Sequence, residues 1–269
     1  MANRITEKFR LLKNDNRGGF IPFIVAGDPN LEITKNLILT LAESGASVIE
    51  LGVPFSDPVA DGATIQASSE RALRNFINVK DILKIVADVR NVGCETPIIL
   101  FSYFNPILQF SLEKFADEAK KSGVDGVLIT DLVPEEAKEF QGILSKQDLA
   151  LIMLAAPTSS DERLRKICEK ASGFVYAVSR AGVTGARIDS SSDAKILVER
   201  LRKFTDLPIA VGFGISTREQ VAEVYRYADA AVVGSAIVSE IIKLAPDFNE
   251  ISPELVKNIG IFAKNLIPQ

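Results

Sequence analysis

The chain has 269 residues, 47% hydrophobic and 25% charged, which is the composition of a globular protein able to bury its own core. Its net charge of −4, with 31 basic and 35 acidic residues, argues against nucleic-acid binding. The chain contains no histidine, which excludes Ser-His and Cys-His nucleophile pairs and the His ligands of most catalytic metal sites.

The start of the chain and its two cysteines show no targeting or metal-binding pattern. The first residues have no apolar signal core, and no apolar run is long enough to span a membrane. We expect no membrane partner, and a cytoplasmic location in a bacterium or the chloroplast stroma for a processed plant chain. Cys94 and Cys168 lack metal or redox spacing and are expected to be packing residues. No metal site is expected.

Eight short runs rich in apolar and β-branched residues alternate with helical patterns along the chain. Most runs are continuously apolar, which is typical of parallel strands buried on both faces. They occupy residues 20–26, 46–51, 97–102, 124–130, 149–154, 173–179, 207–212 and 228–234. The pattern predicts an α/β fold, a (β/α)8 TIM barrel formed by residues 1–269 as one domain, with extra helices near 5–14 and 253–266. An open doubly wound sheet is the alternative.

Several helix starts can be predicted from capping residues. Ser159 with Glu162, and Ser216 with Glu219, have the spacing of a capping box. Pro134 suits a first helical turn. The second and third strand runs start at 46 and 97, 51 positions apart, so we expect an enlarged loop after the second strand. Such a loop lies on the face where barrel enzymes keep their active sites.

Two carboxylates are the candidate catalytic residues. Glu50 interrupts a buried strand pattern, and an apolar site would raise its pKa above the ordinary value of about 4.3. Asp61 lies in the enlarged loop, on the same face of the barrel. A salt-bridged structural acid and a turn or helix-cap aspartate are the respective alternatives.

Glycines at the ends of the last three strands indicate a phosphate site. Gly182-Val-Thr-Gly185 follows the sixth strand, Gly212-Phe-Gly214 ends the seventh, and Gly234-Ser235 ends the eighth and opens a helix. Backbone N–H groups and a helix N-terminus favour an anion there, although each pair could also form a tight turn. Because no Lys lies at a strand's carboxyl end and no His is present, Schiff-base and zinc aldolase chemistry are disfavoured. A phosphate-binding barrel lyase or isomerase is indicated.

The sequence resembles the tryptophan synthase alpha chain family over essentially its whole length. The resemblance is carried by ELGVPFSDPVADG at 50–62, VSRAGVTGAR at 178–187, VGFGIS at 211–216 and VVGSAIV at 232–238. It implies retro-aldol cleavage of indole-3-glycerol phosphate to indole and glyceraldehyde 3-phosphate in tryptophan biosynthesis. Glu50 would be the main acid–base group, and Asp61 would accept a hydrogen bond from the indole N–H.

The resemblance also implies roles for other residues. Tyr176 would lie near Glu50, and Thr184 would close onto Asp61, with loops 53–62 and 179–193 acting as lids. The implied phosphate ligands are Gly185, Gly214, Gly234 and Ser235, and the implied indole pocket is formed by Phe23, Tyr103, Thr130 and Phe213.

A partner is implied as well. The family binds a beta chain carrying pyridoxal phosphate, in an assembly of two alpha and two beta chains, and passes the indole to it. No cofactor is expected in this chain. The implied interface residues are Pro54, Asp57, Asn105 and Pro106.

Three other functions remain open at this point. The chain could be an isomerase or epimerase of another sugar phosphate, a non-catalytic activator of a beta chain, or a module that only binds a phosphorylated metabolite. Turnover of indole-3-glycerol phosphate would distinguish the activity implied by the family resemblance from these three functions.

Overall fold

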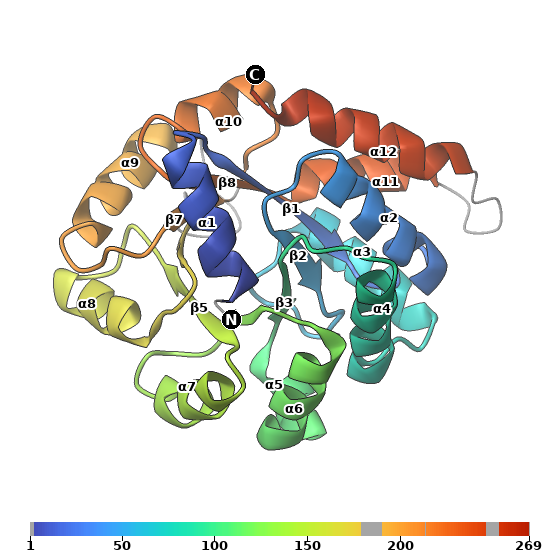
Figure 1. Ribbon diagram of the computed structural model, residues 1–269, viewed down its shortest axis with the longest axis horizontal. Coiled ribbons are helices and arrows are strands. Elements are labelled where there is room, and N and C mark those ends of the chain that lie inside the picture. Colours follow the sequence, from blue (N-terminus) through green and yellow to red (C-terminus); the bar gives the residue numbers. More distant parts are fainter. Residues whose placement is uncertain (1–2, 179–189, 213, 246–252, 269) are drawn as a thin grey trace.

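Eight parallel strands pair in sequence order, and the last closes onto the first to form a barrel surrounded by helices (Figure 1). The computed structural model describes residues 3–178, 190–212, 214–245 and 253–268. The closed ring confirms the predicted TIM barrel and excludes the open sheet. The strands are β1 (Gly19–Val25), β2 (Ile49–Gly52), β3 (Ile98–Ser102), β4 (Gly126–Ile129), β5 (Ala150–Ala155), β6 (Val175–Val178), β7 (Ile209–Gly212) and β8 (Ala230–Val233).

Helices cover the outside of the barrel, and the predicted extra helices are present at both ends of the chain. The last helix packs against the second and the eleventh, outside the ring (Figure 1). The helices are α1 (Arg4–Asn14), α2 (Leu31–Glu43), α3 (Ala63–Arg74), α4 (Val79–Asn91), α5 (Phe104–Phe110), α6 (Leu112–Ser122), α7 (Ala137–Lys146), α8 (Asp161–Lys170), α9 (Ser190–Leu201), α10 (Arg218–Val224), α11 (Ser235–Leu244) and α12 (Pro253–Leu266). None of the helices among the described residues is both long and apolar enough to cross a membrane.

Alternate residues of each strand face two different cores. In β2, Ile49 and Leu51 join the core between the strands and the helices. Glu50 lies between them, and because side chains alternate across a strand it faces the barrel interior. Tyr176 of β6 faces the interior in the same way and belongs to the inner core. The short strands therefore bring polar groups from opposite sides of the ring toward one central space.

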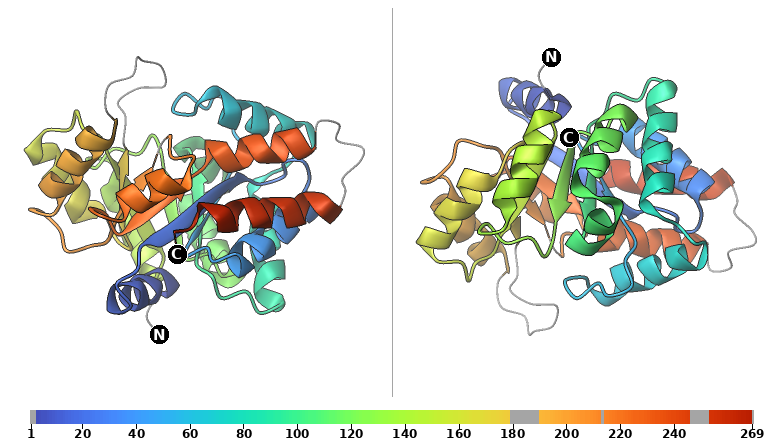
Figure 2. Two further views of the ribbon diagram at one scale, coloured as in Figure 1. Left: turned by 90° about the horizontal axis from the view of Figure 1, so that it is seen from above. Right: turned by 90° about the horizontal axis from the view of Figure 1, so that it is seen from below.

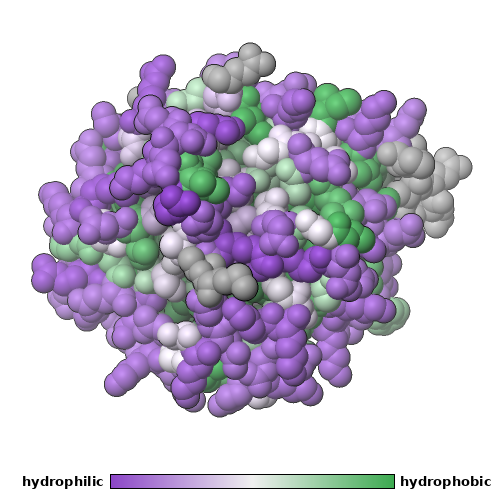
Figure 3. Space-filling view, viewed as in Figure 1, coloured by the Kyte–Doolittle hydropathy of each residue, from purple (hydrophilic) through white to green (hydrophobic). Residues whose placement is uncertain are grey.

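Helix α1 closes the amino-terminal end of the barrel. Its buried residues Ile5, Phe9 and Leu12 belong to the inner core, and the rings of Phe9 and Phe174 lie 5.7 Å apart. Figure 2 shows α1 at the end of the barrel opposite to α3. The surface on the α1 side is mostly hydrophilic (Figure 3). The apolar side of α1 thus packs into the amino-terminal end of the barrel interior.

A buried ion pair fixes this closed end. The carboxylate of Asp125, 3% exposed, accepts hydrogen bonds from Arg90 Nη2 at 2.7 Å, Arg4 Nη1 at 3.2 Å and the Ile98 N–H at 2.8 Å. Arg4 belongs to α1 and Arg90 to α4, so one carboxylate ties two helices to the start of β3.

Three predicted helix starts were wrong by one to three residues. The cap of α8 is Ser160, because the Ser159 hydroxyl instead accepts the Ala156 N–H in a preceding turn. The capping box of α10 joins Thr217 and Gln220, one residue after the predicted pair. Residues 134–136 form a turn, closed by a hydrogen bond from the Glu136 N–H to the Val133 carbonyl, and α7 begins at Ala137.

The long step between β2 and β3 is mostly helix. The prediction of one enlarged loop was therefore only partly correct: residues 53–62 are irregular, and α3 and α4 follow before β3. Helix α3 begins two residues after Asp61 and packs against β1 and α11, so the extra chain forms one side of the open end of the barrel.

Candidate active site

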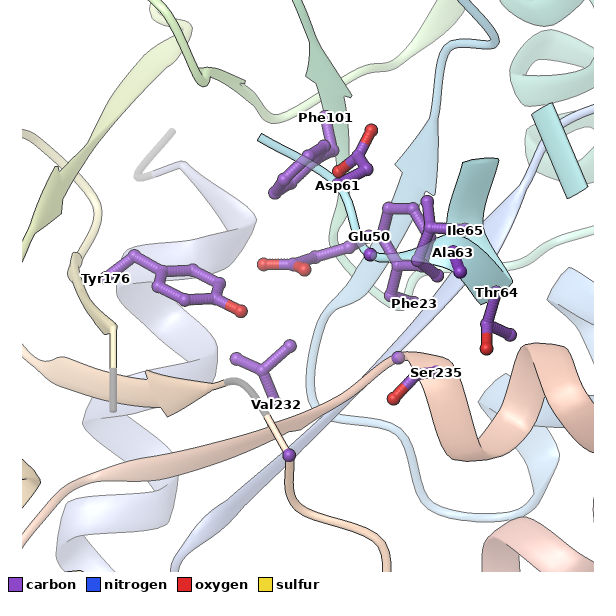
Figure 4. A pocket seen from close by; sticks show the side chains of 13 residues that line it. Phe23, Glu50, Asp61, Ala63, Thr64, Ile65, Phe101, Tyr176, Val232 and Ser235 are labelled. Atoms are coloured by element: carbon purple, nitrogen blue, oxygen red, sulfur yellow. The ribbon is translucent and has the colours of Figure 1, made fainter. Parts of the chain in front are cut away.

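A cavity of about 300 Å³ opens at the carboxyl ends of the strands (Figure 4). Residues from β1, β2, β3, β6 and β8 line it together with the turn after β7, the starts of α3 and α11 and the two residues before α3. They are Phe23, Glu50, Asp61, Gly62, Ala63, Thr64, Ile65, Phe101, Tyr176, Gly214, Val232, Gly234 and Ser235. Both predicted catalytic carboxylates therefore lie in one mainly apolar cavity.

Glu50 is the most deeply buried acid of this cavity. It is 1% exposed, and among the described residues its Oε1 has no hydrogen-bond partner. Burial without a compensating charge raises the pKa of Glu50 from 4.5 to about 8, in the direction predicted from the sequence. A salt-bridged structural acid would instead have a positively charged partner that lowers its pKa. A carboxyl group in this environment can release or take up a proton near neutral pH.

Tyr176 faces Glu50 across the cavity, and its hydroxyl points toward the Glu50 carboxyl group (Figure 4). Burial raises the pKa of Tyr176, and the nearby charges of Glu50 and Asp61 raise it further. The phenol therefore stays protonated at any physiological pH.

Asp61 is held by hydrogen bonds at both its side chain and its backbone. The Tyr103 hydroxyl donates to Oδ2 at 3.2 Å, and that hydroxyl oxygen accepts the Ala60 N–H at 2.9 Å. Gln66 Nε2 donates to the Asp61 carbonyl at 2.8 Å. Burial raises the pKa of Asp61 from 3.8 to about 6, although the Tyr103 hydrogen bond opposes the rise.

The two carboxyl groups consequently differ in protonation at neutral pH. With a pKa of about 8 Glu50 is mostly protonated, and with a pKa of about 6 Asp61 is mostly ionised. Environments that push two pKa values apart assign one group as the acid and the other as the anion. The cavity can therefore donate a proton at one side and stabilise positive charge at another.

Two glycines provide the space for the aromatic side chains of the site. A Cβ on Gly212 would lie 2.0 Å from the Tyr176 hydroxyl oxygen, and one on Gly52 would lie 2.7 Å from Cζ of Phe23. The sequence placed Gly212 in a phosphate-binding motif, but its contact in the structure is with Tyr176. Only the three-dimensional pairing of β6 with β7 reveals this role.

The predicted phosphate residues are partly described. Gly234 is the N-cap of α11 and Ser235 its first residue, and among the described residues no side chain caps this helix. Gly214 has φ +76, a backbone conformation that suits glycine. All three line the cavity, so a helix N-terminus with uncapped N–H groups faces it. Thr184, Gly185 and Phe213 lie outside the described residues.

The predicted indole pocket is only partly assembled around this cavity. Phe23 lines it, and its ring packs edge-on against Phe101 at 5.2 Å. Tyr103 and Thr130 do not line it: Tyr103 lies behind Asp61, and the Thr130 hydroxyl donates to the Ser102 carbonyl. Phe101 was missed, although the two-residue alternation of β3 would have turned it inward.

Other apolar and polar lining residues were also missed. Thr64 and Ile65 follow Asp61 at the start of α3, and Val232 faces inward from β8. The first two lie on a helix that the sequence presented as a loop, so no periodicity signal identified them.

The predicted interface residues lie at the rim of the same end. Pro54 is buried, Asp57 and Asn105 are exposed, and Pro106 is half-buried. The rings of Phe55 and Tyr103 lie 5.1 Å apart and bring these two segments together. Within the described part of the chain, no group of three His, Cys, Asp or Glu side chains could hold a metal ion.

Known proteins resemble this chain over its length. Residues 9–265 match the family described as tryptophan synthase alpha chain. A relative from Geobacter sulfurreducens with that description is 51% identical over 264 residues, 98% of this chain and 97% of its own. The solved subunit alpha from Legionella pneumophila superimposes with a TM-score of 0.89 at 36% identity, covering 99% of this chain and 97% of that one.

A second solved structure comes from a tryptophan synthase α2β2 complex of Pyrococcus furiosus. It superimposes with a TM-score of 0.84 at 41% identity, and the match covers 93% of this chain and 97% of that one. The family match, the closed barrel and the cavity with its two carboxyl groups lead to one conclusion. The chain belongs to the tryptophan synthase alpha chain family, the lyases that cleave indole-3-glycerol phosphate to indole and glyceraldehyde 3-phosphate.

Proposed function

We propose that Glu50 and Asp61 carry out this cleavage as a proton donor and an anionic acceptor. The single observation that supports the proposal most strongly is that both line one cavity while their pKa values lie on either side of neutrality. Such a pair meets the chemical need, because the indole ring itself accepts the electrons of the broken bond. Neither a metal nor a Schiff base is then required.

The reaction balances with these two residues. Protonated Glu50 donates its proton to the indole carbon that bears the glycerol side chain, which makes the ring positive. Ionised Asp61 accepts a hydrogen bond from the indole N–H and stabilises that charge. The Glu50 carboxylate then takes the proton of the neighbouring side-chain hydroxyl. The carbon–carbon bond breaks, its electron pair restores the aromatic ring, and the hydroxyl carbon becomes the aldehyde of glyceraldehyde 3-phosphate.

The other site residues are proposed to hold the substrate. The N–H groups at Gly234 and Ser235, with Gly214 and Gly185, would bind the phosphate at the start of α11, where the helix dipole favours an anion. Tyr176 would orient the Glu50 carboxyl group. Other residues would shape the indole site. Phe23 and Phe101 would form the cavity wall, and Tyr103 would hold Asp61. Thr130, Phe213 and Thr184 are proposed from the family resemblance, Thr184 as the residue that closes onto Asp61.

We further propose that the chain itself uses no cofactor and works with a beta chain. The relative from Pyrococcus furiosus comes from an α2β2 complex, which supports an assembly of two alpha and two beta chains. Pyridoxal phosphate would belong to the beta chain, which would receive the indole at a rim containing Pro54, Asp57, Asn105 and Pro106. A cytoplasmic location fits the bacterial relatives, and a chloroplast stroma location would follow if the source were a plant.

Indole release from indole-3-glycerol phosphate tests this proposal. The purified chain and its Glu50→Gln variant are assayed with and without the cognate beta chain. Release that rises with the beta chain and is lost in the variant supports the residue assignment and the partner together. An active Glu50→Gln variant would refute the role of Glu50, and a rate insensitive to the beta chain would refute the partner.

A further inference from the structure

We infer that Asp28 and Arg71 form an anchor that positions Asp61 for catalysis by fixing helix α3 against the turn after β1. The Asp28 carboxylate is 3% exposed, and the Arg71 Nε donates to its Oδ1 at 2.9 Å. Arg71 Nη2 and the Ser68 hydroxyl both donate to Oδ2. Two parallel N–H donors on one carboxylate define direction as well as distance. The inference rests on the catalytic role proposed for Asp61.

The same face of α3 makes a third contact with this turn. Asn75, at the end of the helix, donates from Nδ2 to the carbonyls of Gly27 at 3.2 Å and Pro29 at 2.7 Å. Ser68, Arg71 and Asn75 are spaced by three and four residues, so they lie on one side of the helix. These three side chains, which run from the middle of α3 to its end, therefore all donate hydrogen bonds to residues 27–29.

The start of α3 connects the anchored helix to Asp61. Asp61 stands two residues before the helix, and Gln66 on its second turn donates to the Asp61 carbonyl at 2.8 Å. The Gln66 N–H bonds the carbonyl of Gly62. Ala63, Thr64 and Ile65 of the same helix line the cavity. A shift of α3 relative to β1 must therefore move Asp61 and one wall of the cavity relative to Glu50 on β2.

A second buried ion pair provides a matched control. Asp125 is also 3% exposed and binds Arg90, whose side chain is 10% exposed, close to the 15% of Arg71. This pair lies at the closed end of the barrel, and neither residue lines the cavity. Both are buried Arg–Asp ion pairs with several guanidinium hydrogen bonds, although Arg90 donates one of them to Asp125 and the others to backbone carbonyls. Only the Asp28–Arg71 pair is linked to Asp61.

The test compares Arg71→Lys with Arg90→Lys in the full chain with its beta chain. Lysine keeps the charge but loses the several hydrogen bonds of the guanidinium, which at Arg71 are bidentate to Asp28. A misplacement of about 1 Å costs about 100-fold in rate, so we expect Arg71→Lys to lower kcat by about tenfold or more. KM for indole-3-glycerol phosphate should change by less than about threefold, because the phosphate contacts remain. Arg90→Lys should leave kcat within about twofold. Equal effects of the two variants on kcat would overturn the inference.

Two additions keep the test decisive. Ser68→Ala removes one hydrogen bond to Asp28 and leaves the Asp28–Arg71 ion pair intact. It replaces Arg71→Lys if that variant does not fold, and it should lower kcat by about threefold or more. The second addition is a carbon-13 NMR titration of the Asp61 carboxyl group, which needs no turnover. Its pKa should fall in Arg71→Lys, because a displaced Asp61 gains solvent, and stay unchanged in Arg90→Lys. An unchanged Asp61 pKa in both variants would contradict the inference.

Asp61→Asn is measured alongside to separate the two proposals. If Asp61→Asn turns over at the wild-type rate, the catalytic role of Asp61 fails, whatever Arg71 does. If Asp61→Asn is inactive while Arg71→Lys and Arg90→Lys behave alike, the anchor alone fails.

Discussion

Replacing Glu50 by Gln is predicted to stabilise the protein increasingly as the pH rises, while lowering turnover by about 100-fold or more. In the folded chain the pKa of Glu50 is raised to about 8 by burial, against an ordinary value of 4.5. Between these two values the unfolded chain has lost a proton that the folded chain retains. The free energy of unfolding of the wild type therefore falls with rising pH in this window, and the loss is complete above pH 8. Gln carries no such proton.

The magnitude follows from the width of the window. Each pH unit within it costs the wild type about 1.4 kcal/mol, which amounts to about 3 kcal/mol at pH 7 and about 5 kcal/mol above pH 8. Because Glu50 is 1% exposed and its Oε1 lacks a partner within the described part of the chain, little solvent screening reduces these values. The Gln amide has nearly the same shape as the protonated acid, so the two proteins should have similar stability below pH 4.5.

Urea unfolding at pH 5, 7 and 9 measures the difference. The unfolding free energy of Glu50→Gln should exceed that of the wild type by less than about 1 kcal/mol at pH 5 and by several kcal/mol at pH 9. Glu139→Gln, at an exposed glutamate of α7, is the control and should change the unfolding free energy by less than about 0.5 kcal/mol. A Glu50→Gln difference that is constant from pH 5 to 9 would refute the reasoning.

Three further substitutions test other parts of the site. Asp61→Asn should lower kcat by roughly 100-fold or more while the affinity for glycerol phosphate, measured by calorimetry, changes little; a matching loss of affinity would make Asp61 structural. Gly212→Ala should destabilise the fold by about 1–3 kcal/mol in thermal unfolding and lower kcat, because its Cβ would meet the Tyr176 hydroxyl at 2.0 Å. An unchanged kcat would refute the idea that Gly212 fixes the position of Tyr176. Tyr103→Phe removes a donor to Asp61, so the acid limb of kcat/KM should move to higher pH; an unmoved limb would contradict the hydrogen bond's role.

The barrel could be predicted because its signal is local. A parallel strand buried on both faces needs a continuous apolar run, and eight such runs are visible in the sequence. Glu50 was visible for the same reason, as a single acid within one of those runs. Helix starts were less certain: two adjacent hydroxyl residues, Ser159 and Ser160, can both cap a helix, and only the backbone turn decides between them.

The supporting contacts of the site could not be predicted, because they join residues far apart in the chain. Tyr103 reaches Asp61 across 42 positions, and Arg71 reaches Asp28 across 43. Neither pair leaves a pattern of spacing or composition. Helix α3 was missed for a related reason: it follows a loop rich in Pro, Asp and Gly, and its cap, Gly62, makes no side-chain hydrogen bond.

The pH dependence of indole release from indole-3-glycerol phosphate tests the central claim most directly. The claim is that Glu50 acts as a proton donor, so kcat/KM for the wild type should fall above an apparent pKa of about 8. Glu50→Gln, measured in the same series, should release indole at a rate lower by about 100-fold or more at the optimum. A wild-type rate that keeps rising above pH 8, or a Glu50→Gln variant with near wild-type activity, would contradict the account.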